Sequence, residues 1–215
     1  NRSKASGIEE FPQALTETLR KTIEHVRTVM NWQPRDSVRL VFHAFKPFKQ
    51  EQIAAVQAVV NGLGDYDTQY AFLHIVEHHP YLLFDLSNGE GVWDAQAKAK
   101  KGRLAPKRGL RLRLSDFENL LVLTGGHEVK RPSDGIPSPI LLRLDRSSTF
   151  KDMKYLTRQV YQFSCHSWRS FFPSPMPITI LYSDLIATQL GNLSHLSNWD
   201  PQTILGPIGR TRWFL

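Results

Sequence analysis

The sequence has little of what defines several common protein classes. It holds one cysteine, Cys165, among 215 residues, so no internal disulfide can form. This cysteine lies in a stretch with helical apolar spacing, which favours a buried structural thiol over a nucleophile. No apolar run reaches the roughly 18 residues that a membrane-spanning helix needs, and no signal peptide opens the chain. We therefore expect a cytoplasmic protein.

Familiar catalytic motifs are also missing. The chain contains no CxxC, HExxH, GxSxG or Walker-type phosphate loop, so the common zinc, hydrolase and nucleotide-triphosphatase classes lose their main support. Adjacent side chains diverge in a strand or tight turn, so His78 and His79 predict a polar pair at a strand end rather than a metal site. His43 and His74 fall within predicted strands, where we expect core or groove positions.

Acidic residues are fewer than basic ones. The chain has 20 Asp plus Glu against 27 Lys plus Arg, for a net charge of +7. This excess favours a polyanionic partner such as nucleic acid or an anionic membrane surface, although it can also serve solubility alone. With 41% hydrophobic residues and no internal repeat, residues 1–215 predict one domain. Because the first residue is Asn1, we expect a processed or truncated chain.

Hydrophobic periodicity predicts alternating helices and strands. Spacings of three or four residues indicate helices, and dense or alternating apolar residues indicate strands. Pro34 is expected to stop the first helix, and Ser147 and Ser148 are expected to cap the third. Strands separated by helices predict an α/β sheet with crossover connections. The expected helices are 9–31, 50–63, one beginning after Ser148, and 184–190; the expected strands are 37–45, 70–76, 81–84, 110–114, 118–124, 139–144 and 178–182.

Basic residues gather between Lys98 and Arg113. This segment has eight cationic side chains and no acidic one, and it predicts a basic loop leading into a strand. Each phosphate contact would release counterions, with a slope of log K against log salt of about −0.9 per phosphate for duplex DNA. A solvated surface loop is the alternative.

Asp184 is the carboxylate of most interest. It directly follows the predicted strand 178–182 and stands in the first turn of the predicted helix. Two-metal nucleases place several Asp or Glu residues at such strand ends, because hard cations require oxygen ligands. An acid at a helix N-terminus is equally explained by the helix dipole.

Several strings, in this order, resemble the C-terminal part of an Argonaute PIWI domain. WQPRDSVRLVFHAFKPFK at 32–49 resembles the second-half strand that ends in Arg-Asp-Gly in slicing members, and GGHEVKRPS at 125–133 resembles the loop that ends in Arg-Pro-Ser. YQFSCHSWRS at 161–170 and PITILYSD at 177–184 resemble the stretch ending in Tyr-Ala-Asp or Tyr-Ala-His. RTRWFL at 210–215 resembles a prokaryotic Argonaute terminus.

The resemblance implies an RNase H-like mixed sheet flanked by helices, an α/β fold, lacking the N-terminal strands of the PIWI domain and the MID domain. It implies that the chain holds a guide strand, RNA or DNA, for pairing with a DNA or RNA target. The carboxylate of Leu215 would enter the guide 5′-phosphate pocket with Mg²⁺, while Trp213 and Phe214 pack the tail inward. The residues expected to contact nucleic acid are Lys46, Lys49, His79, Lys130, Arg131, Arg169, Ser170, Arg210 and Arg212.

The chain departs from slicing members at one position. Where they have Arg-Asp-Gly, this sequence reads Ala44-Phe45-Lys46, which resembles short or otherwise inactive prokaryotic Argonautes. We therefore expect no cleavage, with Asp184 as the remnant of the catalytic tetrad. The resemblance further implies defence against foreign DNA and a separate TIR-APAZ or Sir2-APAZ effector subunit. The alternatives are an active divalent-metal-dependent endonuclease that uses Asp184, and a structural subunit that scaffolds an effector.

Overall fold

A computed structural model describes residues 2–95, 98–124, 138–168, 173–200, 202–211 and 213–214; side chains are described from residue 12 onward, except those of Val92, Leu205 and Arg210. The chain forms two compact units. Unit 1 comprises Asn1–Ile75 and Arg143–Lys151, and unit 2 comprises Val76–Leu142 and Asp152–Leu215. None of the helices in these ranges is long and apolar enough to cross a bilayer.

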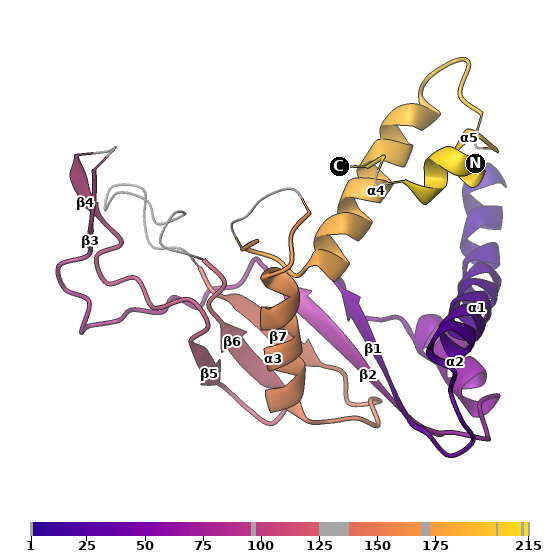
Figure 1. The fold of residues 1–215 in the computed structure, drawn as a ribbon, viewed down its shortest axis with the longest axis horizontal. Coiled ribbons are helices and arrows are strands. Elements are labelled where there is room, and N and C mark those ends of the chain that lie inside the picture. The colour runs from indigo at the N-terminus through magenta and orange to yellow at the C-terminus, as the bar shows by residue number, and fades with distance from the viewer. Residues whose placement is uncertain are drawn as a thin grey trace. The chain divides into compact units, whose positions relative to one another are not determined.

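The largest sheet is mixed and has five strands (Figure 1). Its order is β1-β2-β7-β6-β5, with β7 contributing residues to both units. β1 and β2 are parallel, from Ser37↔Asp67 to Ala44↔His74, whereas β5 and β6 are antiparallel. The predicted mixed α/β sheet flanked by helices is confirmed. The strands are β1 (Ser37–Ala44), β2 (Asp67–Val76), β5 (Arg111–Arg113), β6 (Glu118–Leu121) and β7 (Ile140–Leu144).

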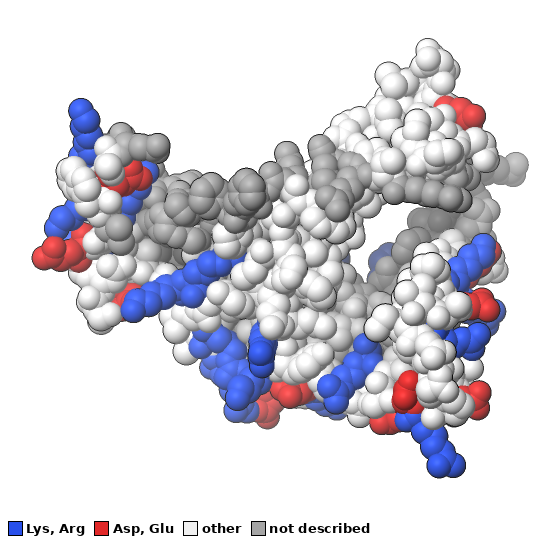
Figure 2. Space-filling view, viewed as in Figure 1, with Lys and Arg blue, Asp and Glu red and all other residues white. Residues whose placement is uncertain are grey.

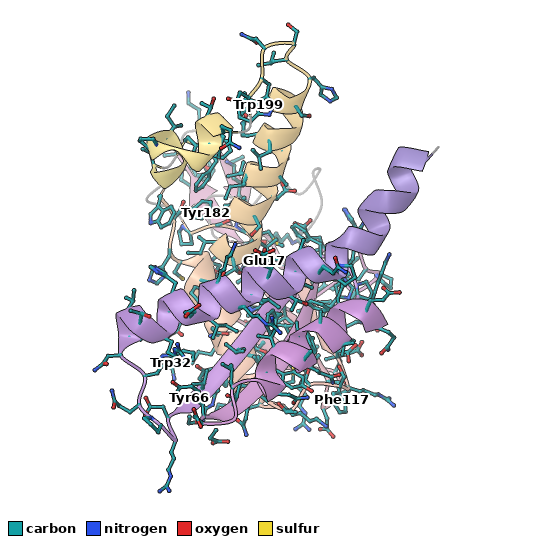
Figure 3. All side chains as sticks on the ribbon, turned by 90° about the vertical axis from the view of Figure 1, so that its right-hand side faces the viewer. Glu17, Trp32, Tyr66, Phe117, Tyr182 and Trp199 are labelled. Atoms are coloured by element: carbon teal, nitrogen blue, oxygen red, sulfur yellow. The ribbon has the colours of Figure 1, made fainter. Side chains whose placement is uncertain are left out.

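Unit 1 packs two helices beside its strands. α2 (Gln50–Asn61) forms the crossover between β1 and β2, and α1 (Arg2–Met30) lies across α2 (Figure 3). The core joins Ile53 and Val56 of α2 to Phe72 of β2, with Leu19 of α1 packed against it. Burial of such side chains contributes about 1.5–3 kcal/mol each, so the predicted apolar stripes of both helices fix this packing.

The end of α1 differs from the prediction. The helix ends at Met30, four residues before Pro34, because Asn31 adopts a left-handed conformation with φ of 51°. Asn tolerates this conformation better than most residues and commonly ends helices. The amide of Trp32 then donates to the carbonyl of Arg27 at 3.1 Å. Pro34 therefore follows the helix end and does not cause it.

Unit 2 packs α3 (Met153–Ser164) against β6. Buried Asn119 of β6 donates to the Thr157 hydroxyl at 2.7 Å and to the Met153 carbonyl at 3.3 Å. The predicted cap of this helix was wrong: Asp152 caps α3 by accepting from the Tyr155 amide. Ser148 instead accepts from the Phe72 amide at 3.0 Å within unit 1.

The strand predicted at 178–182 was also wrong. These residues are the first turns of α4 (Ile178–Ser194), which continues through the predicted helix 184–190. β-Branched and aromatic residues favour strands locally, but packing overrides this preference because a helix places Ile180 and Tyr182 in the buried interior. Two short helices follow, α5 (Gln202–Leu205) and the 3₁₀ helix η2 (Pro207–Arg210).

Two further predictions in unit 2 need correction. Residues 81–84 form no strand, and Tyr81, Leu82 and Phe84 are exposed. A hairpin that the sequence did not suggest follows instead, formed by β3 (Val92–Asp94) and β4 (Ala99–Lys101). Cys165 is exposed, because it follows the last residue of α3 as the C-cap instead of continuing the buried stripe.

Candidate nucleic-acid interface

The basic segment 98–113 is more structured than the predicted loop. It contains β4 and β5, and several of its cations pair with acids outside it. Lys100 contacts Glu90 at 2.8 Å, Lys101 contacts Asp94 at 2.6 Å, and Arg113 contacts Asp116. Lys98, Arg103 and Arg111 are exposed and form no ion pair with the residues that the structure describes. Lys107 is exposed as well, but its charge acts on Asp85, whose pKa is lowered by the hydrogen bond from Ser87 and further by Lys107. Lys98, Arg103 and Arg111 are therefore the cations of this segment best placed to contact a phosphate.

Arg108 attaches the basic segment to α3 and to Ser174 through its guanidinium group. Its Nη2 donates to the Ser164 hydroxyl at 2.6 Å and to the Ser174 carbonyl at 3.2 Å. Its guanidinium also lies over the Tyr161 ring, 5.6 Å from the centroid. Gly109 permits this approach, because its φ is +86° and an added Cβ would lie 3.2 Å from the same ring. Arg108 therefore anchors the segment to α3, and sequence reasoning had grouped it with the surface cations.

A second anchor closes the segment that we name the arm, residues 85–105. The Asn88 side chain donates to the carbonyls of Gly102 and Ala105 at 3.0 and 3.1 Å. The Leu104 amide donates to the Asn88 carbonyl, and the Asp85 amide donates to the Leu104 carbonyl, both at 2.8 Å. Figure 2 shows both basic and acidic side chains around the hairpin that forms the arm's end, at the left of the view.

Aromatic side chains hold the C-terminal tail in unit 2. Trp168 stacks on Tyr182 with ring centroids 4.8 Å apart, and its amide donates to the Tyr182 hydroxyl at 2.6 Å. The ring centroids of Phe214 and Tyr182 are 5.7 Å apart, and the Trp213 ring contacts the Phe214 ring edge-on. This agrees with the expectation that Trp213 and Phe214 pack the tail inward.

The end of β1 carries no carboxylate. The segment from His43 to Lys49 presents Phe45, which is 42% exposed, and the exposed cations Lys46 and Lys49. His74 at the equivalent position of β2 shares a 2.7 Å hydrogen bond with the Phe45 carbonyl. Burial lowers the pKa of His74; the hydrogen bond to the Phe45 carbonyl partly offsets this effect, and nearby Arg143 adds to it. A neutral His74 donates from Nε2 to this carbonyl and fixes the strand ends together.

His43 lies one residue before this end and is largely enclosed. Burial lowers its pKa to about 4, so its imidazole is neutral at pH 7. A neutral imidazole can ligate a metal ion, but no cluster of three or more His, Cys, Asp or Glu residues suited to a metal occurs in the part of the chain that the structure describes. The histidines of these strands thus serve the fold.

Asp184 does not occupy the place that the sequence predicted. It is an exposed residue well inside α4, neither at a strand end nor in the first turn of a helix. The helix-dipole explanation for its position therefore fails as well, because the effect is confined to the first turn. Nothing in the local structure of α4 sets Asp184 up as one of several converging ligands.

The other residues expected to contact nucleic acid differ in their surroundings. Lys46 and Lys49 are exposed, whereas both ring nitrogens of His79 contact backbone: Nε2 lies 2.6 Å from the Pro139 carbonyl, and Nδ1 accepts from the Tyr81 amide at 3.2 Å. His79 therefore orders this turn and has no ring nitrogen left for a phosphate. Lys130, Arg131, Arg169, Ser170, Arg212 and Leu215 lie outside the described residues, as does the side chain of Arg210.

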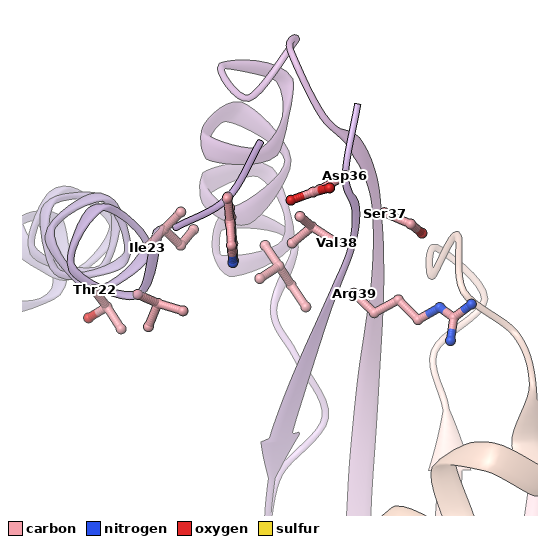
Figure 4. Close-up of a pocket in the computed structure, with 9 residues that line it drawn as sticks. Thr22, Ile23, Asp36, Ser37, Val38 and Arg39 are labelled. Atoms are coloured by element: carbon pink, nitrogen blue, oxygen red, sulfur yellow. The ribbon is translucent and has the colours of Figure 1, made fainter. Parts of the chain in front are cut away.

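Unit 1 also holds a cavity of about 440 Å³ between α1 and the start of β1 (Figure 4). Ile23, Val26, Trp32, Val38 and Leu40 supply its apolar wall, and Thr22, Asp36, Ser37 and Arg39 its polar residues. Trp32 is held by an edge-on contact with Tyr66 (Figure 3). Arg39 lies 4.9 Å from the centroid of the Phe150 ring. Asp36 is the one carboxylate among the lining residues, and the Arg39 guanidinium lies against the Phe150 ring, so the lining lacks the several carboxylates that usually hold a metal ion.

Comparison with known proteins finds a homologue of this chain. Across its whole length the chain is 35% identical over 217 residues to a protein named Protein argonaute from Cereibacter sphaeroides (strain ATCC 17025 / ATH 2.4.3). The chain is homologous to part of a prokaryotic Argonaute. It spans 28% of the length of that relative. No family model matches the chain.

Two solved Argonaute structures resemble this chain to different degrees. A crystal structure of Aa-Ago with externally bound siRNA matches 85% of this chain and 21% of its own, with a TM-score of 0.58 and 16% identity. A crystal structure of A. aeolicus Argonaute matches 80% of this chain and 21% of its own, with a TM-score of 0.46 and 17% identity. The first of these shares the fold of this chain, an α/β fold with a mixed sheet flanked by helices.

Sequence reasoning missed residues on the arm of this Argonaute homologue. Trp93 and Leu86 of the arm are 62% and 83% exposed, and Phe84, which directly precedes the arm, is 53% exposed. The neighbouring segment 98–113 had been singled out only for its charge. The sequence signal was weak, because β3 and β4 have three residues each, too few for a clear alternating pattern. An aromatic residue next to a lysine-rich stretch was the feature that could have drawn attention to Trp93.

Proposed function

We propose that this chain is the guide-binding PIWI part of an Argonaute that recognises nucleic-acid targets by base pairing and does not cut them. Homology along the whole chain supports guide-directed binding. In such proteins base pairing supplies the sequence specificity, while the protein contacts backbone and shape. The exposed cations of the basic segment and the net charge of +7 suit the backbone contacts.

The proposed absence of target cleavage rests on the side chains at the end of β1. Two-metal hydrolysis requires carboxylates that hold two ions about 3.5–4 Å apart. Phe45 offers no oxygen ligand from its side chain, and the positive charge of Lys46 opposes cation binding nearby. The Phe45 carbonyl accepts from His74, so this backbone oxygen is engaged in a protein contact. The residues present at this strand end do not fit a pair of catalytic Mg²⁺ ions.

The test uses the intact Argonaute loaded with a 5′-phosphorylated guide and a matched, labelled target, with Mg²⁺ or Mn²⁺. We expect stable, sequence-dependent target binding and no product cut opposite the guide. Asp184→Ala provides the matched control and should behave like the wild type. Specific cleavage that disappears in Asp184→Ala would overturn the proposal in favour of an active endonuclease.

The remaining parts of the proposal concern partners. We propose that the Leu215 carboxylate shares Mg²⁺ with the guide 5′-phosphate, since a hard cation suits both oxygen donors. Residues appended after Leu215 should then reduce the preference for 5′-phosphorylated guides, and a fully retained preference would refute the role. We also propose a cytoplasmic defence role with a TIR-APAZ or Sir2-APAZ effector. Copurification of an NAD-degrading subunit with the intact protein is the corresponding test.

A further inference from the structure

The hairpin of the arm displays an aromatic residue on an ordered support. β3 and β4 form a two-stranded sheet by themselves, in which Trp93 stands opposite Lys100. Trp93 is 62% exposed, although a tryptophan without a partner usually buries most of its large apolar surface. Exposure of this ring lowers the hydrophobic stabilisation of the fold. We take this as an indication that the ring contacts a ligand.

The hairpin itself is firmly built. Lys101 and Asp94 form a 2.6 Å ion pair whose side chains are only 24% and 30% exposed, and Lys100 pairs with Glu90 on the outside. Gly91 lets the strands close, because its φ is +70° and an added Cβ would lie 2.5 Å from the Lys101 carbonyl oxygen. The backbone bonds made by Asn88 close the base of the arm. Trp93 is therefore carried by an ordered backbone, so binding need not order the hairpin itself.

The cations of this hairpin segment indicate which kind of ligand Trp93 would bind. Lys98 and Arg103 flank β4, are exposed, and form no ion pair with any residue that the structure describes. An exposed aromatic ring and exposed cations on one hairpin suit single-stranded nucleic acid, because the bases can stack on the ring while the cations contact the phosphates. A purely apolar protein partner would gain nothing from these two cations.

We propose that Trp93 stacks on an unpaired nucleobase of a single strand whose phosphates contact Lys98 and Arg103. This role rests on the proposed function, because it assigns the arm to the same nucleic acid. The contact is independent of base sequence, since every base has a π-face. The arm thereby holds an unpaired part of the guide or target strand.

The experiment measures binding of two single-stranded probes to the intact Argonaute. One probe is an oligothymidylate, and the other has the same length and phosphate count but abasic sites in place of its bases. Trp93→Ala should weaken oligothymidylate binding by about 5- to 150-fold, and leave the abasic probe unchanged. Trp93→Phe should restore most of the affinity, because it retains an aromatic face.

Leu86→Ala is the matched control, because Leu86 is an exposed apolar residue of the same arm and has no ring. It should bind both probes as the wild type does. Unchanged oligothymidylate affinity in Trp93→Ala, or an equal loss for both probes, overturns the stacking role while guide binding persists. If the wild type binds neither a guide nor either probe, the proposed function itself fails.

Discussion

At the scale of single residues, buried and engaged polar groups shape how this protein responds to its surroundings. His43 is the clearest case, because burial lowers its pKa from 6.5 to about 4. The unfolded chain therefore takes up a proton between these two pH values while the folded chain does not. Stability linked to His43 is complete above pH 6.5 and is lost as the pH falls toward 4.

We therefore expect the free energy of unfolding to fall between pH 6.5 and 4, by up to about 3 kcal/mol from this residue. His43→Gln removes the titrating group and should flatten the pH dependence, whatever its effect at pH 7. Denaturant titrations at pH 7, 5.5 and 4.5 measure both curves. Parallel curves for the two proteins would show that His43 does not titrate in this window.

Arg108 and Arg111 make a matched pair of cations with opposite roles. Arg108 donates to Ser164 and Ser174, whereas Arg111 is exposed. Arg108→Gln should lower the free energy of unfolding by about 1–3 kcal/mol, because buried partners lose their hydrogen bonds. Arg111→Ala should leave stability nearly unchanged and reduce the salt slope of single-strand binding by about 0.7 for one lost phosphate contact.

Thermal denaturation and affinity at several salt concentrations separate the two effects. A lowered slope in Arg108→Gln with normal stability would reverse the assignment, and would return Arg108 to the phosphate-contacting cations. The sequence alone assigned both residues the same role, since position along the chain says nothing of which guanidinium turns inward.

At the scale of elements, capping decides where α3 begins. Asp152 accepts from the Tyr155 amide at 2.9 Å, while Ser147 bonds Asp145 in the preceding turn. Asp152→Ala should lower the free energy of unfolding by about 0.5–2 kcal/mol. Ser147→Ala should cost less, because it removes no bond to the helix. Comparison of the melting temperatures checks this order, which the predicted Ser147–Ser148 cap would invert.

Elements also show where sequence patterns mislead. Residues 178–182 have strand propensity yet begin α4, since a helix buries Ile180 and Tyr182. The consequence for function is direct: as part of a longer helix, Asp184 loses the strand-end position that suggested a metal ligand. Conversely, β1, β2, β6 and β7 were predicted within a few residues, because long or densely apolar strands carry a strong signal.

At the scale of the whole molecule, binding is expected to depend on cations spread over several loops. The resemblance assigns Arg131 and Arg169 to the guide backbone, and phosphate contacts carry no sequence information. Arg131→Ala with Arg169→Ala in the intact protein should weaken binding of unrelated guides about equally and flatten the salt slope. The double variant Arg20→Ala and Lys21→Ala on α1 removes the same charge and serves as the control. Equal losses in both variants would point to net charge alone.

The sequence by itself determined the fold class, the homology and the absence of acidic residues at the end of β1. Those features depend on the order and spacing of residues, which can be read directly from the sequence. Only the tertiary structure decided that Arg108 is an anchor, that both nitrogens of His79 are engaged, and that Trp93 is displayed on a hairpin. The first two outcomes depend on contacts between residues far apart in sequence, Arg108 with Ser164 and His79 with Pro139, and the third depends on the pairing of β3 with β4. Local propensity cannot encode them, because the partner of each group is chosen by packing.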